Sequence, residues 1–308
     1  MTRVAGTGDA RRRDRGTRDA ERRSAGSRHA ASPRSHVLAP LGWLGVLALL
    51  VVVPGCGQAA PSAALYGHDD VRIPPIAVPR ARSPPGPIPA ELKLPAGEGR
   101  FPAVIVLHGC GGRGASQLTW ARRLNGWGYA ALVPDSMTPR GVVRVCEPAD
   151  QKLVTPRDRV ADVGSAVAWL RTRPEIDPNR IAVLGLSHGG TTAVIATERA
   201  YEGFGLRAAI DYYGPCVDSA AHGPVPLLVL VGGADDWGHP ALRCEAYGMA
   251  LQPGLVFEIH TYPGVHHAFD NPDMVRTVSS SHIMEYNQAA AEDSFLRVHA
   301  FLDRWMRH

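Results

Sequence analysis

Signatures of metal and nucleotide binding are scarce in this chain. Its five cysteines form no C-x-x-C pair, and its 13 histidines form no H-E-x-x-H pattern. Because His266 and His267 are adjacent, their rings cannot easily point at one ion. A P-loop is also absent. The sequence therefore predicts no metal site and no nucleotide cofactor.

Internal repeats and coiled-coil heptads are absent too, while a hydrophobic share of 45% is ordinary for a globular core. The formal net charge of +4 is unevenly distributed along the chain. Residues 1–36 hold ten arginines and four acidic residues, a net +6, which leaves −2 for residues 37–308. The basic charge thus belongs to the amino-terminal segment, and we expect no nucleic-acid-binding surface.

A charge-free run follows the basic segment. From Val37 to Val53, seventeen residues carry no charged side chain. This run is short for a membrane span, and Pro40 and Gly42 interrupt it. A basic segment, an apolar run and small residues after it are typical of a secretory signal. The sequence therefore predicts that residues 1–56 form a leader that directs export.

The sequence allows two ways in which this leader is processed. The sequence V-P-G-C at residues 53–56 resembles a bacterial lipobox, in which Cys56 would become the lipidated first residue. The proline before the glycine fits that pattern imperfectly. Cleavage near Ala60 or Ala64 would instead release a secreted protein. A membrane is expected as a partner only through this lipid anchor.

Two segments follow the leader: a tether at residues 57–88 and the body of the chain at residues 89–308. Residues 57–88 are rich in proline and alanine, which predicts a tether that leads into edge strands. From residue 89 to residue 308, strand and helix patterns alternate, which predicts one α/β domain with a parallel sheet covered on both faces. The expected strands are residues 102–107, 129–133, 181–186, 207–213, 226–231 and 256–262. The expected helices are a segment capped by Ser116, residues 156–173 and residues 288–306.

The sequence G-L-S-H-G at residues 185–189 lies between a predicted strand and a predicted helix. This context is typical of a nucleophile elbow, in which a tight turn raises a serine hydroxyl above the sheet. The flanking glycines leave room for the strained turn. Ser187 is therefore the candidate nucleophile. The backbone N–H of His188, at the start of the helix, is a candidate donor to an oxyanion.

Partners for the serine follow later strands in the order expected of an α/β-hydrolase, namely Ser, Asp and His. An aspartate pair, Asp235 and Asp236, comes after strand 226–231, and a histidine pair, His266 and His267, comes after strand 256–262. A serine needs such a base to take its proton, and the base needs an acid to orient it. The strand order alone does not choose within either pair.

A second oxyanion donor is expected in the H-G-C-G-G loop that follows strand 102–107. Its glycines allow the backbone to approach a substrate closely, and the N–H of Cys110 is the candidate. A plain strand-to-helix turn is the alternative interpretation of this loop. We expect a structural hydrogen bond from His108 and no role for the ring of His188.

Several segments together resemble the dienelactone hydrolase family of α/β-hydrolases: HGCGG, PDSMTPRG, GLSHGG, GGADDW and YPGVHHAFDNP. The resemblance covers about residues 90–306. It implies an α/β-hydrolase fold with a mostly parallel central sheet. It also implies that Asp235, the first aspartate of its pair, is the catalytic acid. The histidine before the small residue and phenylalanine, His267, is then the base.

The chain departs from this family in two places. Dienelactone hydrolases proper use a cysteine nucleophile, where this chain has Ser187. They also carry an arginine shortly after the catalytic histidine, which holds the substrate carboxylate, where this chain has the sequence D-N-P at 270–272. We therefore expect a carboxylic ester or a different lactone as the small-molecule substrate, hydrolysed through an acyl-enzyme. An acyltransferase with the same residues, or a catalytically silent binding protein, is the alternative; the oligomeric state is left open.

Four cysteines remain after Cys56, an even number in a chain that we expect to be exported. Cys110 and Cys146 lie in loops after consecutive strands, while Cys216 and Cys244 follow two other neighbouring strands. Pairing within each of these two sets joins adjacent loops, so we favour disulfides 110–146 and 216–244. The other connectivities and four free thiols remain open.

Overall fold

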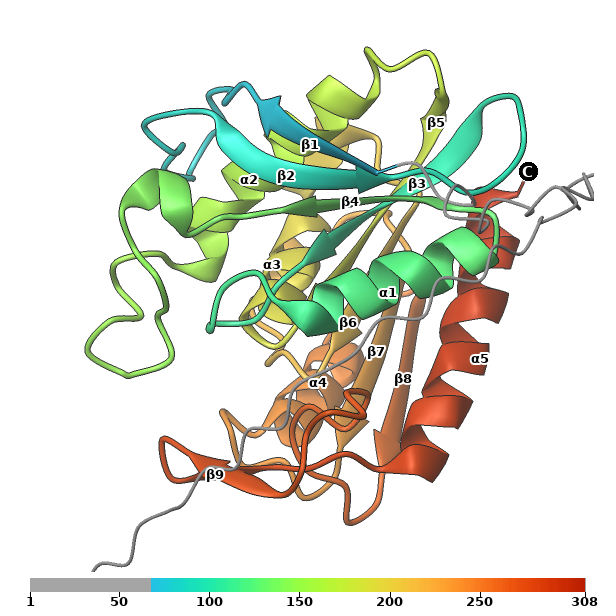
Figure 1. Cartoon of the computed structure of the whole chain (residues 1–308). Helices are drawn as coiled ribbons and strands as arrows, with labels where there is room; N and C mark the ends of the chain where they lie inside the picture. The colour runs from blue at the N-terminus through green and yellow to red at the C-terminus, as the bar shows by residue number, and fades with distance from the viewer. Residues whose placement is uncertain (1–67, 308) are drawn as a thin grey trace, which may run out of the picture. The chain divides into compact units, whose positions relative to one another are not determined.

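An eight-stranded sheet forms the centre of the computed structural model, which describes residues 68–307. The strand order is β1-β2-β4-β3-β5-β6-β7-β8 (Figure 1). The first two strands run antiparallel to their neighbours, and all pairs from β4 to β8 are parallel. This is the mostly parallel sheet of the α/β-hydrolase fold, as predicted.

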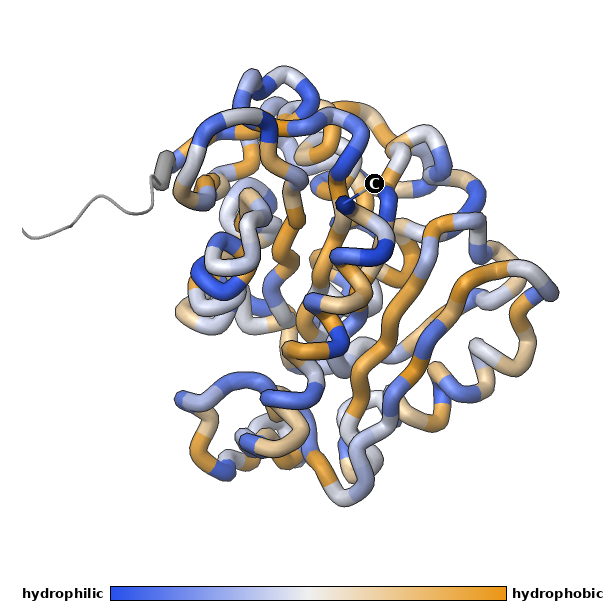
Figure 2. Tube along the Cα trace, turned by 90° about the vertical axis from the view of Figure 1, so that its right-hand side faces the viewer, coloured by the Kyte–Doolittle hydropathy of each residue, from blue (hydrophilic) through white to orange (hydrophobic). Residues whose placement is uncertain are grey.

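The strands form where the sequence has short apolar or β-branched runs. The central strands are buried almost throughout, as expected where helices cover both faces of a parallel sheet. Figure 2 shows these apolar strands passing through the middle of the body. Their bounds are β1 His68–Ile73, β2 Ile88–Lys93, β3 Phe101–Leu107, β4 Ala130–Pro134, β5 Ile176–Leu186, β6 Ala208–Tyr212, β7 Leu227–Gly232 and β8 Phe257–Tyr262.

Helices cover both faces of the sheet (Figure 1). Helices α1 (Ala115–Gly126) and α5 (Gln288–Met306) pack on one face, where they share a buried apolar cluster with β3, β5 and β6. The other face is covered by α2 (Pro156–Leu170), α3 (His188–Ala196) and α4 (Pro240–Met249), which share a second cluster. Within residues 68–307, no helix combines the length and the apolar character that a membrane span requires.

Two helix boundaries differ from the prediction. Helix α1 begins after Gly114, whose N–H donates to Gln117 Oε1 at 2.8 Å, so Ser116 lies inside the first turn and is not the cap. Helix α2 ends at Leu170 rather than at residue 173. The next residues form a turn with i→i−3 hydrogen bonds, because the residue before Pro174 is disfavoured in a helix.

The folded body begins inside the segment for which the sequence predicts a tether. Strand β1 lies within residues 57–88 and pairs with β2 at the edge of the sheet. After it, the N–H of Ile76 donates to Ser165 Oγ of α2, and Val78 is buried. Part of the predicted tether is therefore packed against the domain. The leader, the residues around it and Cys56 lie outside the described residues.

The carboxyl ends of the parallel strands carry the loops that bear most of the predicted site residues. A small hairpin also lies at this end of the sheet, formed by β9 (Thr277–Ser279) and β10 (His282–Met284). Its second strand is joined to the loop after β8 by the N–H of Glu285, which donates to the carbonyl of His267. Candidate site residues that are far apart in sequence can therefore meet at one edge of the sheet.

Candidate active site

Ser187 occupies a strained turn between β5 and α3. Its backbone has φ 55° and ψ −117°, a conformation that serine rarely adopts. The turn leaves no room for side chains at its flanks. A Cβ on Gly185 would overlap the backbone of Gly189, and a Cβ on Gly189 would lie 2.6 Å from the carbonyl oxygen of Leu107. The G-x-S-x-G spacing is thus a packing requirement of this turn.

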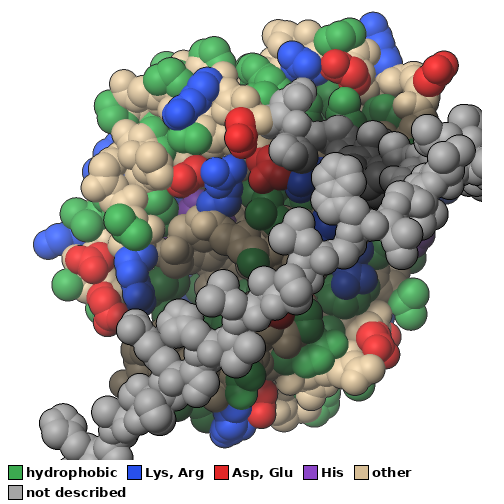
Figure 3. Space-filling model, viewed as in Figure 1, with side chains coloured by type: hydrophobic (Ala, Val, Ile, Leu, Met, Phe, Trp, Pro, Cys, Tyr) green, Lys and Arg blue, Asp and Glu red, His purple; other side chains and the backbone are tan. Residues whose placement is uncertain are grey.

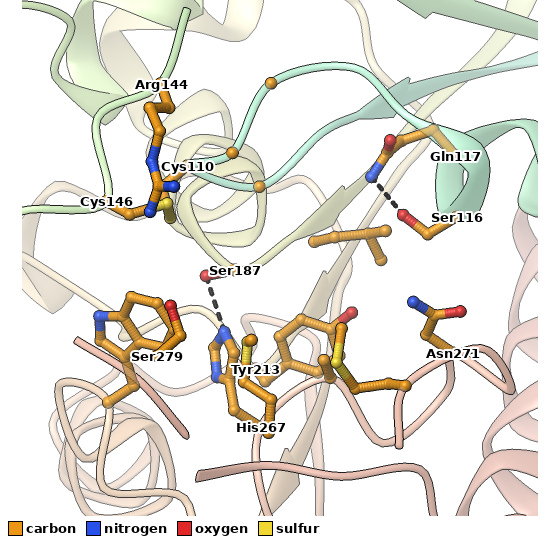
Figure 4. Close-up of a pocket in the computed structure, with 18 residues that line it drawn as sticks. Cys110, Ser116, Gln117, Arg144, Cys146, Ser187, Tyr213, His267, Asn271 and Ser279 are labelled. Atoms are coloured by element: carbon orange, nitrogen blue, oxygen red, sulfur yellow. Dashed lines mark hydrogen bonds between the residues drawn. A yellow bond between two sulfur atoms is a disulfide. The ribbon is translucent and has the colours of Figure 1, made fainter. Parts of the chain in front are cut away.

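A chain of hydrogen bonds joins the three predicted residues, and Figure 4 shows its link between Ser187 and His267. Ser187 Oγ lies 2.9 Å from His267 Nε2, and His267 Nδ1 lies 2.7 Å from Asp235 Oδ2. Asp235 Oδ1 also accepts from the N–H of Trp237 at 2.9 Å. His267 and Asp235 are both buried. In such a chain the imidazole can take the serine proton while the carboxylate holds the ring in one tautomer.

The neighbouring candidates in each pair lie elsewhere. Asp236 is exposed and lies 3.1 Å from His282 Nδ1 of the hairpin. His266 points to the backbone, where its Nδ1 lies 3.2 Å from the carbonyl oxygen of Ala234. Neither residue is part of the hydrogen-bonded chain that contains Ser187. The structure thus brings together the members of each pair that the family resemblance favoured.

The two predicted oxyanion donors lie beside the serine. An added Cβ on Gly109 would lie 3.6 Å from Ser187 Cβ, which shows how close the loop after β3 comes to the elbow. Among the described residues, the N–H groups of Cys110 and His188 donate to no protein acceptor. The carbonyl of Cys110 accepts from the N–H of Val145 at 2.8 Å, which holds the peptide that follows Cys110.

The same loop carries the spacing G-x-G-x-x-G over residues 109–114, which is found in dinucleotide-binding turns but also arises by chance. In a dinucleotide site the free N–H groups at the following helix start hold a pyrophosphate. Here the N–H of Gly114 donates to Gln117, and the carboxylate of Asp135 after β4 accepts from the N–H groups of Met137 and Thr138. The loop instead lines the cavity beside Ser187.

A cavity of about 290 Å³ opens above the serine (Figure 4). Ser187 and His267 both line it, together with the loop after β3 and the β9–β10 hairpin. Its apolar wall comprises Leu186, Tyr213, Trp237, Met274 and Met284. Its polar side chains, apart from Ser187 and His267, are Ser116, Gln117, Arg144, Asn271 and Ser279. A small molecule with an apolar part could therefore place a carbonyl group next to Ser187.

The comparison with known protein families agrees with this architecture. The family model described as "Dienelactone hydrolase family" matches residues 88–306, which is most of the chain. The chain belongs to the dienelactone hydrolase family. This establishes the resemblance that the five sequence segments suggested.

Two curated relatives and one solved structure illustrate the range of the family. A probable 2-oxo-3-(5-oxofuran-2-ylidene)propanoate lactonase from Bradyrhizobium is 28% identical over 197 residues, which cover 58% of this chain and 78% of the relative. A putative carboxymethylenebutenolidase from Methylorubrum extorquens is 28% identical over 203 residues, covering 60% and 68%. The crystal structure of a putative dienelactone hydrolase from Klebsiella pneumoniae shares the fold, with TM-score 0.63, 22% identity, and coverage of 78% and 99%.

Asp270, the first residue of the D-N-P sequence that stands where the family carries an arginine, lies outside the cavity. Its buried carboxyl group accepts from Tyr213 Oη and from Trp120 Nε1, each at 2.7 Å. Burial raises the pKa of this carboxyl, while the two donors act in the opposite direction. The cavity wall at this point is provided by the next residue, Asn271. Asp270 thus anchors the wall instead of facing a substrate.

Aromatic rings that the sequence analysis did not single out hold His267 in place. The ring centroid of Tyr213 lies 4.6 Å from that of His267, and the Trp237 ring lies 5.0 Å from it. Tyr213 directly follows β6 and has a positive φ of 47°. The Gly-Pro sequence after it signals a turn at the carboxyl end of a strand, and this signal could have placed Tyr213 near the site.

Two further histidines near the serine, the buried His108 and the half-buried His188, have structural contacts. His108 Nε2 accepts from the N–H of Ser136, and its Nδ1 lies 2.7 Å from the carbonyl oxygen of Gly109. Burial lowers the pKa of His108 well below its usual value. His108 is therefore the structural hydrogen-bonding residue that we expected. The ring of His188, for which we expected no role, is hydrogen-bonded at both nitrogens.

The four cysteines of the body are joined as Cys110–Cys146 and Cys216–Cys244, the pairing that the sequence favoured. The first disulfide lies at the cavity. The second lies near the buried carboxyl of Asp211, whose pKa burial raises well above its usual value. Because the sulfurs of this second pair are bonded to each other, they do not offer the thiolates that a metal would need.

Proposed function

We propose that the chain is a serine hydrolase of small carboxylic esters or lactones. The observation that carries this proposal is the hydrogen-bonded chain from Ser187 through His267 to Asp235, open to a cavity. Membership of a hydrolase family and the lactonase and butenolidase names of two relatives support the substrate class. The size and apolar wall of the cavity favour a compact substrate.

The mechanism follows from the geometry of these side chains. Ser187 Oγ attacks the carbonyl carbon while His267 Nε2 takes its proton, and Asp235 holds the resulting imidazolium. The N–H groups of Cys110 and His188 donate to the negatively charged oxygen of the tetrahedral intermediate. His267 then gives the proton to the departing alkoxide, which leaves an acyl-enzyme. For a lactone the released alcohol stays on the acyl group.

Water completes the reaction. It attacks the acyl-enzyme as His267 takes one of its protons. The second tetrahedral intermediate then collapses, and His267 gives that proton to the departing Ser187 Oγ, which releases a carboxylic acid and restores the enzyme. Tyr213 and Trp237 pack against His267, which limits the movement of its ring. An acyltransferase would use the same acyl-enzyme with another alcohol or an amine in place of water, and product analysis separates these two outcomes.

The test uses the full chain, a panel of short chromogenic esters and lactones, and a fluorophosphonate label. Ser187→Ala should keep the fold and reduce turnover by about 10³-fold or more, because the attacking atom is removed. Labelling should disappear with it. Ser116→Ala is the matched control, because Ser116 also lines the cavity but has its hydroxyl bonded to Gln117. Near wild-type turnover in Ser187→Ala would contradict the mechanism.

A further inference from the structure

A fully buried arginine contacts the nucleophile elbow formed by residues 185–189. Arg159 belongs to α2, has no exposed surface, and is the largest of the fully buried side chains described. Its Nη1 lies 2.9 Å from Nδ1 of His188, the residue directly after Ser187. The other guanidinium nitrogens, Nε and Nη2, have no hydrogen-bond partner among residues 68–307. The contact with His188 is thus the one hydrogen bond found for this side chain.

The protonation of His188 determines the direction of that hydrogen bond. Burial, and then the neighbouring Arg159 charge, lower the pKa of His188 to about 3. The imidazole is therefore neutral at neutral pH, and its Nδ1 lone pair accepts from the guanidinium. The proton then resides on Nε2, which donates to the carbonyl of Val154 at 3.1 Å. Both ring nitrogens are consequently fixed by partners outside the elbow.

Arg159 keeps its charge without a carboxylate of its own. Burial lowers its pKa to about 10, which still leaves the guanidinium protonated at neutral pH. The nearby carboxylate of Asp162 is held by Arg140, with two contacts of 2.9 Å. A buried cation that lacks a carboxylate partner is costly for folding. Its contact with the residue after the nucleophile points to a role at the site.

We propose that Arg159 is a positioning residue for the oxyanion hole, acting through the side chain of His188 on the orientation of the His188 peptide N–H. This inference rests on the proposed function, because it assumes that this N–H stabilises an oxyanion. The Ser187 backbone is strained, and the carbonyl of the Ser187–His188 peptide accepts from the N–H of Thr191 at 3.0 Å. Arg159 and the carbonyl of Val154 add a second anchor, which acts on this peptide through the His188 ring.

The second oxyanion donor is tied to the same loop. Val154 lies near the end of the segment between β4 and α2, and this segment also carries Val145 and Cys146. The N–H of Val145 donates to the carbonyl of Cys110 at 2.8 Å, and Cys146 is bonded to the Cys110 sulfur. His188 and Cys110 therefore both contact the segment between β4 and α2. Loss of the Arg159 contact should change the orientation of the His188 N–H in the oxyanion hole while leaving the cavity walls in place.

The first experiment replaces the guanidinium by an uncharged side chain of similar length. Arg159→Met should lower kcat by about tenfold or more and change KM less than twofold, because an interaction made in the transition state is weakened. The rate of inactivation by a fluorophosphonate should fall in parallel. Arg157→Met is the matched control: it removes an arginine from the same helix, but this one pairs with Glu198. Its kcat should stay near wild type.

A double-mutant cycle separates positioning from a general effect on packing. His188→Ala keeps the backbone N–H but removes the ring, so it should reproduce the loss of kcat by itself. Combining it with Arg159→Met should add little, because Arg159 acts through that ring. Additive losses, or a kcat within twofold of wild type in either single variant, would overturn the inference.

The wild-type protein provides a measurement that needs no variant. Nitrogen NMR of His188 should show the tautomer with its proton on Nε2. A proton on Nδ1 would exclude the hydrogen bond from Arg159 and overturn the inference, even if the Arg159 variants fail to fold. The failure of the proposed function looks different. A wild type that neither turns over esters nor reacts with the fluorophosphonate contradicts both, whereas an active, Ser187-dependent wild type with an unaffected Arg159→Met contradicts only the positioning role.

Discussion

Asp235 and Asp236 are adjacent in the chain but lie in different surroundings. Asp235 is buried and bonded to His267, while Asp236 is exposed beside His282 of the hairpin. Asp235→Asn should therefore lower kcat by roughly 10⁴-fold, because an amide cannot hold the histidine in the required tautomer. Asp236→Asn, the matched control, should change kcat little. Steady-state turnover of one ester by both variants measures the difference, and a reversed order would move the acid by one residue.

The two histidines allow the same comparison for the base. His267 Nε2 lies within hydrogen-bond distance of the serine, whereas His266 contacts a backbone carbonyl. We expect His267→Ala to lose turnover by about 10³-fold or more and His266→Ala to keep most of it. Melting temperatures of both variants check that the fold is retained. Comparable losses in two equally stable variants would show that the assignment of the base is wrong.

At the scale of single residues, the sequence allowed prediction of the site residues that lie in loops directly after parallel strands. The loops after β5, β7 and β8 lie at one edge of a parallel sheet, so the ends of these strands predicted Ser187, the aspartate pair and the histidine pair. The family resemblance then chose Asp235 and His267 within the two pairs. The sequence did not identify Tyr213 or Arg159 as neighbours of the site. Their contacts join segments separated by dozens of residues, and no local pattern encodes such packing.

At the scale of elements, the prediction was good where burial determines the structure. The runs of apolar residues in β3 to β7 give a clear signal because both sides of each strand are covered. Strand β1 was not predicted as such. Its sequence, H-D-D-V-R-I, has few apolar residues, and it forms by pairing with β2 at the edge. The hairpin strands β9 and β10 were not predicted either. Each has three residues, and they form by pairing with each other.

The start of helix α2 offers a pH-dependent test. Asp158 accepts from the N–H and hydroxyl of Thr155 and pairs with Arg82 of the preceding segment. Burial opposes ionisation, but the hydrogen bonds from Arg82 and Thr155 lower the pKa of Asp158 to about 2. A lowered pKa means that the folded state favours the ionised form. The stability it provides is present above the unfolded pKa and is lost as pH falls toward the folded value.

Asp158→Asn should consequently reduce the stability of the fold by about 1 kcal/mol at pH 7, the usual scale for the loss of a capping interaction at a helix start. The difference from wild type should shrink as the pH falls from about 4 to about 2. Thermal unfolding across this range measures it, and Asp150→Asn, which changes a loop carboxylate outside α2, is the control. A difference that stays constant down to pH 2 would show that the charge of Asp158 is not what stabilises the helix start.

At the scale of the whole molecule, the leader and the body differ in net charge, because residues 1–36 carry +6 and residues 37–308 carry −2. Acidic and basic side chains are interspersed on the face of the body shown in Figure 3. We propose that the basic leader directs export and that Cys56 receives a lipid. Metabolic labelling with a palmitate analogue should then mark the wild type and not Cys56→Ala. An unlabelled, secreted protein that begins near Pro61 or Leu65 would instead favour ordinary signal cleavage.

Export would place both disulfides where they persist, and the two should differ in what they support. Cys110–Cys146 lies at the cavity and holds a loop that carries a proposed oxyanion donor. Cys216 and Cys244, the second of which belongs to α4, are both buried and do not line the cavity. Mild reductant should therefore reach the first disulfide before the second. Alkylation followed by peptide mapping identifies which thiols have opened.

Double variants then separate the two roles. Cys110→Ala with Cys146→Ala should lower kcat, because the loop after β3 loses its covalent link to the loop that supports it. Cys216→Ala with Cys244→Ala should lower the free energy of unfolding by about 2–4 kcal/mol, the usual value for a disulfide, while kcat stays near wild type. Equal effects of both double variants on kcat would contradict the assignment. The oxyanion hole would then owe its geometry to the fold as a whole, and not to the disulfide that borders it.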